Sequence, residues 1–460
     1  MTAARAVAAG SAAALGKTAS KVSGLGADPS PDELEAAARR HRFELRRLLW
    51  GKLYRVVKGY APQSVDARLP DGRHWTAALP ADKVVWSRVS LCGRHTRGGW
   101  AEVHLAPGAG PDAKARAGFG ALVQCGSVWA CPVCAARIMA VRTTELTTLV
   151  QRHLGHETGA AMPTGRSWHR PDRDATFVTL TIRHQWGNSL AAALRMVRRA
   201  WRRFLQGRAW QLLKAQHAVT GYVVRLETTH GPNGWHPHLH ALFLHDTKLA
   251  PGALDELRTA FYTRWATIVA QLDGRAVPTW EHGVDVRAGS AGAAAYLQSM
   301  KLAMELTGSD GKLGRTRAHR SPFQILADHA ESGSPRDWAL FREYVDGTRG
   351  ARQLTWSRGL KRRYAIGEVG DEEAAAMPEP EARTIVNIEA EVYARLTRIP
   401  GALARVLDAA ERGGAEAVEL EVFTLVRPEY LREAELIGPP PWMEAAPFWN
   451  PDTDHWSPDV

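Results

Sequence analysis

The central part of the chain alternates between short runs rich in β-branched and aromatic residues and longer stretches in which apolar residues recur at helical spacing. Alternation of apolar and polar residues predicts strands, whereas apolar residues three and four positions apart predict helices. The predicted strands are residues 175–182, 221–228, 237–244 and 283–287, and the predicted helices are 189–213, 254–272 and 291–306. The resulting order is β-α-β-β-α-β, followed by a helix.

This order is that of the ferredoxin-like split βαβ arrangement, in which an antiparallel sheet carries helices on one face. We therefore expect an α+β fold for a central domain at residues 175–365. The flanking parts are expected to be a flexible tail at 1–30, an N-terminal region at 31–156 that starts with a helix at 32–50, an acidic linker at 366–383 and a mainly helical region at 384–460. A further helix is expected at 323–344, and a strand-like apolar run occupies 417–426.

The strongest chemical feature is the segment His236-Pro237-His238-Leu239-His240 in the third predicted strand. Side chains two positions apart in a strand share a face and lie about 6–7 Å apart, so His238 and His240 project together. Two imidazoles at this spacing can converge on one metal ion. Ordinary strand histidines satisfied by hydrogen bonds are the alternative.

A third ligand comes from the neighbouring strand. Residues 231–234, Gly-Pro-Asn-Gly, have the composition of a tight turn. A hairpin centred on the middle of this turn places Glu227 opposite His238, and opposed residues share a face. A slip of one residue would turn Glu227 away. His238, His240 and Glu227, with coordination positions left open, suit a divalent cation that also holds a phosphate oxygen.

Tyr296 lies on the predicted helix that follows the fourth strand. A phenol has a pKa of about 10 and is a poor nucleophile near neutral pH, but a metal ion on the attacked phosphate lowers the barrier. Attack on DNA would give a phosphotyrosine and a free hydroxyl, and because the bond energy is kept the step can be reversed. A packing role is the alternative, since the chain has 9 tyrosines.

The chain has four cysteines, and Cys131 and Cys134 have the C-x2-C spacing of a zinc knuckle. Cys125 and Cys92 could complete a set of four thiolates around a structural zinc ion, with His95 as the competitor of Cys92. A disulfide or a redox pair is the alternative. Because we see no secretory signal and no transmembrane run, we expect a cytoplasmic protein, where clustered cysteines more often bind metal.

The charge balance favours a polyanionic partner. Lys and Arg number 59 against 48 Asp and Glu, a formal net charge of +11, and basic side chains gain affinity for nucleic acid by releasing its counterions. A merely soluble basic protein has the same balance. The basic residues that we expect to contact phosphates are Arg198, Arg199, Arg202 and Arg203 on one predicted helix, and Lys301, Lys312 and Arg315 after the fourth strand.

Six segments carry recognisable motifs: residues 177–181 (FVTLT), 236–240 (HPHLH), 294–297 (AAYL), 125–134 (CGSVWACPVC), 321–324 (SPFQ) and 352–357 (RQLTWS). Together they resemble the rolling-circle plasmid replication initiators of actinobacterial type, which are members of the HUH endonuclease superfamily. The resemblance covers roughly residues 85–365, and the histidine motif and the cysteine block are its most specific parts.

The resemblance implies that the central domain binds a plasmid double-strand origin, nicks one strand where it is single-stranded, and later rejoins the ends. Tyr296 would remain on the 5′ phosphate while the 3′ hydroxyl primes synthesis. The cofactors implied are Mg²⁺ or Mn²⁺ at the histidines and structural Zn²⁺ at the cysteines. DNA is the expected partner, together with a host helicase and polymerase.

The sequence departs from the family pattern at two positions. The family usually has a lysine one helical turn after the tyrosine, whereas Lys301 follows Tyr296 by five residues. Some relatives have a glutamate one turn before the tyrosine, where this chain has Gly292. The residue that ends the reaction is therefore not identified, and Asp285 is one candidate.

Three other functions compete with this prediction. A relaxase or a transposase of the same superfamily would use the same chemistry on different DNA. A histidine-triad nucleotide hydrolase would use the His-x-His-x-His motif without a metal or a tyrosine, but leaves the cysteines and the basic charge unexplained. A zinc-containing DNA-binding regulator would bind an origin without cutting it.

Overall fold

We analysed a computed structural model of the 460-residue chain. The residues that the structure describes are 31–50, 52–57, 64–68, 74–78, 83–107, 115–155, 172–184, 187–288, 319–378 and 381–426. By their internal contacts they fall into two compact units. Unit 1 comprises residues 1–42 and 126–377, and unit 2 comprises residues 43–125 and 378–460. Each unit is described by itself below.

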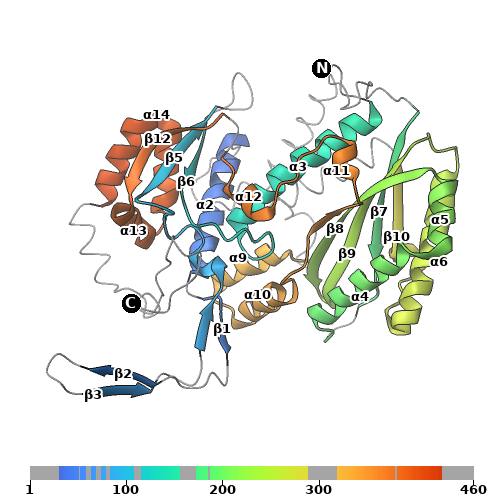
Figure 1. Cartoon of the computed structure of the whole chain (residues 1–460), viewed down its shortest axis with the longest axis horizontal. Helices are drawn as coiled ribbons and strands as arrows, with labels where there is room; N and C mark the ends of the chain where they lie inside the picture. The colour runs from blue at the N-terminus through green and yellow to red at the C-terminus, as the bar shows by residue number, and fades with distance from the viewer. Residues whose placement is uncertain are drawn as a thin grey trace. The chain divides into compact units, whose positions relative to one another are not determined.

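Unit 1 is built on a five-stranded sheet in which every pair of neighbours is antiparallel (Figure 1). The strand order across the sheet is β10-β7-β9-β8-β11. The strands are β7 (Asp174–Thr181), β8 (Val219–Gly231), β9 (Gly234–His245), β10 (Val284–Ala288) and β11 (Leu354–Trp356). The long β8–β9 hairpin therefore lies inside the sheet, where β7 and β11 flank it.

Three helices cover one face of this sheet: α4 (Leu190–Phe204), α5 (Gly207–Gln216) and α6 (Ala253–Leu272), which lie together beside it in Figure 1. Their aromatic side chains pack around Phe243 of β9, which contacts the rings of Trp201, Trp210 and Phe261. Phe243 is fully buried. Because side chains alternate along a strand, the even-numbered residues of β9, including His238 and His240, face away from these three helices.

The other helices of unit 1 are α3 (Pro132–Leu154), α7 (Trp280–Gly283), α9 (Pro322–Ser332), α10 (Pro335–Gly347), α11 (Leu360–Arg363) and α12 (Asp371–Ala376). A buried charge network joins three of them. Glu145 of α3 accepts hydrogen bonds from Arg142 at 2.8 Å and from Lys361 of α11 at 2.9 Å. Arg142 also binds Asp371 of α12 at 2.7 Å. The network holds α11 and α12, which follow the sheet along the chain, against α3.

Unit 2 contains a three-stranded antiparallel sheet in the order β12-β5-β6 and two smaller two-stranded sheets. Its elements are β1 (Tyr54–Val57), β2 (Ser64–Arg68), β3 (His74–Ala78), β4 (Lys83–Trp86), η2 (Arg88–Leu91), β5 (Trp100–Ala106), β6 (Arg116–Gly120), β12 (Arg383–Glu389), α13 (Ala390–Arg398) and α14 (Ala402–Leu425), and α2 (Pro31–Leu49) precedes them along the chain. Helices α13 and α14 pack on the three-stranded sheet, where Phe119 meets Tyr393 with ring centroids 5.7 Å apart.

Most of the elements expected from the sequence are present. The order β-α-β-β-α-β is found in unit 1, and its four strands have the sheet order 4-1-3-2 when numbered along the chain. The α+β class, the antiparallel sheet and the helical C-terminal region agree with the expectation. The helix expected at 291–306 lies outside the described residues, as does the tail at 1–30.

Five expectations need correction. The helix expected at 189–213 is two helices that meet at Gly207, where φ is +79°. The helix expected at 323–344 is likewise divided at Gly333, where φ is +69°. Residues 383–389 form strand β12 because they pair with β5, and the strand-like run at 417–426 is the end of helix α14. Part of the segment expected as an acidic linker is helix α12, which packs on α3.

Histidine burial makes the stability of unit 1 depend on pH. His153 of α3 is fully buried, with Nδ1 2.7 Å from the Tyr364 hydroxyl and Nε2 2.8 Å from the backbone oxygen of Asp174. Burial lowers the pKa of His153 from 6.5 to about 4. The stabilisation that depends on the neutral ring is therefore complete above pH 6.5 and is lost as the pH falls from 6.5 towards 4.

We expect the free energy of unfolding of the wild-type protein to fall more steeply than that of His153→Gln between pH 6.5 and pH 4.5, by about 1.4 kcal/mol per pH unit. Urea denaturation at several pH values measures both slopes. As a control, replacement of the exposed His282 by glutamine should leave the wild-type slope unchanged. Equal slopes for the wild type and His153→Gln would contradict the assignment.

Candidate metal centres

The β8–β9 hairpin has the register expected from its turn. Strand β8 ends at Gly231 and β9 begins at Gly234, so Pro232 and Asn233 form the turn between them. Glu227 pairs with His238, as predicted. The hairpin therefore brings the carboxylate beside the histidines without any contribution from distant segments.

Three side chains of this hairpin converge on one point: those of Glu227, His238 and His240. The Glu227 Oε2 atom lies 3.2 Å from His238 Nε2 and 3.3 Å from His240 Nε2. One donor atom from each residue lies within 4.8 Å of the other two, an arrangement that could hold a metal ion. Ligands about 2.1 Å from a common ion at angles near 90–105° are separated by about 3.0–3.3 Å. The two distances from Glu227 to the histidines therefore fit one shared ion.

Hydrogen bonds to the outer ring nitrogens orient the two histidines. His238 Nδ1 lies 3.2 Å from the backbone oxygen of His236, and because a carbonyl only accepts, this nitrogen carries the proton. The Nε2 atom of His238 faces the Glu227 carboxylate. His240 Nδ1 lies 3.1 Å from the Thr179 hydroxyl of β7, a group that can donate or accept a hydrogen bond. Such outer bonds are what hold metal-binding imidazoles in place.

The charge states of these groups suit a cation. Burial lowers the pKa of His240, so the ring is neutral at neutral pH. Burial alone would raise the pKa of Glu227, but Arg225 and the two imidazoles outweigh it and hold the pKa well below its ordinary value. An ionised carboxylate oxygen beside two imidazole nitrogens is a donor set that attracts a cation.

Arg225 was not expected from the sequence. Its guanidinium lies 2.6 Å from the second oxygen of Glu227, and the arginine side chain is 4% exposed. Arg225 and Glu227 are two positions apart on β8, so they share a face of the sheet. The same strand parity that led to Glu227 could have found Arg225. The ion pair leaves Oε2 as the carboxylate oxygen that faces the histidines.

His236 takes no part in the donor group. Its Nδ1 atom lies 3.0 Å from Nδ1 of His184, which follows β7. Burial, followed by the neighbouring histidines, lowers the pKa of His236 to about 3. The pair of His184 and His236 extends the polar surface beyond His238. His184 is not part of a sequence motif, so no sequence pattern indicated it.

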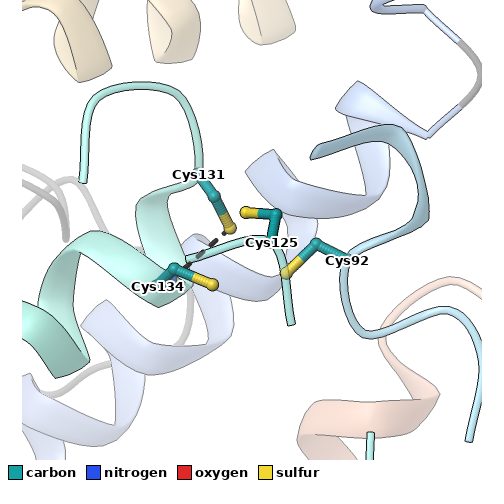
Figure 2. Close-up of side chains that lie close together, drawn as sticks. All are labelled: Cys92, Cys125, Cys131 and Cys134. Atoms are coloured by element: carbon teal, nitrogen blue, oxygen red, sulfur yellow. Dashed lines mark hydrogen bonds between the residues drawn. The ribbon is translucent and has the colours of Figure 1, made fainter. Parts of the chain in front are cut away.

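The four cysteines form a second group. None forms a disulfide, and all four are buried. Their sulfur atoms all lie within 4.8 Å of one another, and Figure 2 shows the side chains of Cys92, Cys125, Cys131 and Cys134 gathered around a common centre. Sulfurs around a tetrahedral zinc ion with bonds near 2.3 Å are about 3.8 Å apart. His95, the alternative to Cys92, is exposed and is not in the group.

Local backbone geometry supports the cysteine group. Cys131 caps α3, its sulfur accepting from the N–H of Cys134 at 3.5 Å, and this bond sets the spacing of the C-x2-C pair. Cys92 and Cys125 are each followed by a glycine in the left-handed region, with φ of +66° at Gly93 and +61° at Gly126. Residues with a Cβ atom rarely adopt this backbone conformation. These Cys-Gly pairs were a signal that the sequence analysis did not use.

The other site residues expected from the sequence are placed as follows. Tyr296, Lys301, Lys312 and Arg315 lie outside the described residues. Arg198, Arg199, Arg202 and Arg203 are on α4, on the side of the sheet opposite the donor group. Asp285 lies on β10, is exposed, and is bound to Arg287 at 2.8 Å. The described helices include none that is long and apolar enough to span a membrane.

The fold and the donor groups define a sheet domain with a candidate divalent-metal centre on one face. Comparison with known proteins shows that part of this domain is similar to one protein family. Residues 123–249 match the model of the Rep_1 replication protein family. That range contains three of the cysteines and the whole β8–β9 hairpin. No solved structure matches the chain.

Two curated relatives are similar to the chain. Protein rep of Streptomyces lividans is 26% identical over 317 residues, which is 55% of this chain and 66% of the relative. A neomycin resistance protein of Streptomyces cyanogenus is 28% identical over 148 residues, or 27% of this chain and 30% of the relative. The chain thus covers less than two thirds of either relative. The family match and the longer similarity confirm the resemblance to Rep-type plasmid replication initiators.

The contribution of the Arg225–Glu227 ion pair should be measurable in the free energy of unfolding. We expect Arg225→Met to lower the free energy of unfolding by about 3 kcal/mol, because it leaves the Glu227 carboxylate without its partner. In the double variant with Glu227→Gln, the loss should be smaller than the sum of the two single losses. Urea denaturation of the four proteins completes the cycle, and strictly additive losses would show that the pair is not coupled.

Proposed function

We propose that the protein is a rolling-circle replication initiator that nicks and rejoins one strand of a plasmid origin. The observation that carries the proposal is the convergence of His238, His240 and Glu227 on one face of the sheet. The match to replication proteins supports DNA as the partner. Rep initiators are generally endonucleases, and the proposal assigns this activity to the chain.

The catalytic ion that we propose is Mg²⁺ or Mn²⁺, which would polarise the scissile phosphate and offset its growing negative charge. The chain's own part is to hold that phosphate in place. Glu227 and the two histidines contribute one carboxylate and two neutral donors, which leaves coordination positions for phosphate oxygens. Thr179 and the backbone of His236 keep the imidazoles turned towards the centre.

We propose Tyr296 as the nucleophile. Its oxygen would form a bond to phosphorus as the bond to the 3′ oxygen breaks, with the phenol losing its proton and the 3′ oxygen gaining one. The product is a 5′ phosphotyrosine and a free 3′ hydroxyl. Attack by a 3′ hydroxyl on the phosphotyrosine reverses these changes and rejoins DNA.

The histidine-triad hydrolase is the less favoured alternative because its histidines act without a carboxylate ligand, whereas Glu227 contacts both His238 and His240. For the cysteine group we propose structural zinc, since four thiolates at this spacing match the donor set of closed zinc sites.

The nicking proposal is tested by incubating the full chain with Mn²⁺ and labelled single-stranded oligonucleotides that tile the replicon carrying its gene. We expect the wild-type protein to form a covalent protein–DNA adduct that is visible on a denaturing gel. The adduct should be absent in Tyr296→Phe, and its amount should fall by on the order of 100-fold in His238→Ala. Tyr262→Phe is the matched control and should form the adduct normally.

The outcomes separate the competing functions. An adduct that survives in Tyr296→Phe would move the nucleophile to another tyrosine. The absence of any adduct, together with tight binding to one of the oligonucleotides or its duplex, would reject the enzyme and favour the DNA-binding regulator.

Zinc is tested by elemental analysis of the purified protein. We expect about one zinc ion per chain, lost or strongly reduced in Cys134→Ser because three thiolates bind the ion far less tightly than four. His95→Gln is the matched control and should keep its zinc. Loss of zinc in His95→Gln, together with normal zinc content in Cys92→Ser, would overturn the assignment of Cys92 as the fourth ligand.

A further inference from the structure

Helix α4 presents a straight stripe of arginines to solvent. Arg195, Arg198, Arg199 and Arg202 are all exposed, and their spacing of i, i+3, i+4 and i+7 places them along one side of the helix. The stripe is about 10 Å long, at 1.5 Å per residue. Arg203, which the sequence analysis grouped with them, is only partly exposed, and its backbone oxygen is held by Arg264.

The stripe has no acidic partners within the described residues. None of its four arginines makes an ion pair there. No aspartate or glutamate occurs in the sequence between Asp174 and Glu227. Glu343, which bonds the first N–H of α4 at 2.9 Å, also receives the Trp235 indole N–H at 2.8 Å.

Such a stripe costs stability in the free protein. Like charges three and four positions apart on a helix repel one another, by about 0.2–0.5 kcal/mol per pair. The opposite side of α4 is fully used for packing, with Leu194, Val197 and Phe204 buried against the sheet and α6. The arginines therefore take no part in the buried packing of α4, and their arrangement suits a polyanionic ligand.

The fold separates this stripe from the candidate metal centre. Helix α4 packs on the side of β9 that carries Phe243, whereas His238 and His240 point to the other side. In Figure 1, α4 runs along the sheet on the side where α5 and α6 also lie. A phosphate held by the histidines cannot therefore reach the stripe, and the two features must meet different parts of a ligand.

We propose that the α4 stripe binds the phosphate backbone of double-stranded DNA, apart from the single strand held at the metal centre. The proposal rests on the proposed function only for DNA as the partner. A duplex carries a negative charge about every 1.7 Å along its axis, which a 10 Å row of four guanidinium groups complements. Single strands are usually bound with stacked bases, but the aromatic residues of α4 and α5, Trp201, Phe204 and Trp210, are all buried.

The test compares binding of two DNA probes by the full chain, without a divalent metal, over a range of salt concentrations. One probe is a duplex of arbitrary sequence and the other is a single strand of equal length. In the variant with Arg195, Arg198, Arg199 and Arg202 all replaced by glutamine, we expect duplex affinity at low salt to fall on the order of 100-fold. The slope of log affinity against log salt should become shallower by about 3.6, since each of the four lost phosphate contacts removes about 0.9.

Two matched variants control the experiment. Replacement of the same four arginines by lysine keeps the charges and should keep most of the duplex affinity and the salt slope. Replacement of four exposed arginines of unit 2, Arg97, Arg383, Arg395 and Arg412, by glutamine changes the net charge equally and should leave the slope within about 1 of the wild type. The quadruple glutamine variant should unfold at no lower temperature than the wild type, because it removes repulsion from α4.

Three results would overturn the proposal. An unchanged salt slope in the quadruple glutamine variant would make the stripe a solvated helix face. An equal loss of affinity for the duplex and the single strand would show that the stripe does not distinguish duplex DNA from other polyanions. An equal loss in the unit 2 control would mean that net charge, not this stripe, drives binding. Because no metal and no cleavage are involved, failure of the nicking proposal leaves this test intact.

Discussion

The pairing register of β8 with β9 is the constraint on which the candidate metal centre depends. Cross-strand pairing of Glu227 with His238 puts the carboxylate on the face shared by the two histidines. A shift of one residue would send Glu227 to the helix-covered face, into the aromatic core around Phe243. That core resists the shift, because an ionised carboxylate among buried rings is costly and Phe243 would lose its packing. The hydrophobic core therefore fixes the geometry of the polar site.

The two faces of the sheet divide the chemistry of unit 1. On one face, Glu227 and the histidines gather donor atoms, while Arg225 and Thr179 hold two of the groups in place. On the other face, α4 buries an apolar side and presents arginines to solvent. Strand β9 contributes to both faces of the sheet, since its alternate side chains lie on alternate faces. The proposed metal centre and the proposed DNA-binding stripe therefore lie on opposite faces of the same sheet.

The cysteine group shows how short-range and long-range constraints combine. The C-x2-C pair is preset by the first turn of α3, where Cys131 caps the helix and receives the N–H of Cys134. Cys125 and Cys92 come from loops, and each is followed by a glycine in the left-handed region. The four buried sulfurs lie close together without disulfides, so the group could hold a metal ion. Sequence spacing alone left Cys92 and His95 as competitors, and burial separated them.

The sequence determined whatever depends on neighbours along the chain. Strand alternation put His238 and His240 on one face, and the turn composition at residues 231–234 was enough to pair Glu227 with His238, because a hairpin is a local structure. The motifs also sufficed for the resemblance that the family match confirms. Only the tertiary structure decided how β7 and β11 flank the hairpin, that Thr179 and His184 reach the histidines, and that the arginines of α4 lie on the opposite side of the sheet. It also decided that residues 383–389 form a strand, because their partner β5 lies nearly three hundred residues earlier. Contacts of this kind depend on packing between distant segments, and a local pattern carries no information about which distant segment will be its partner.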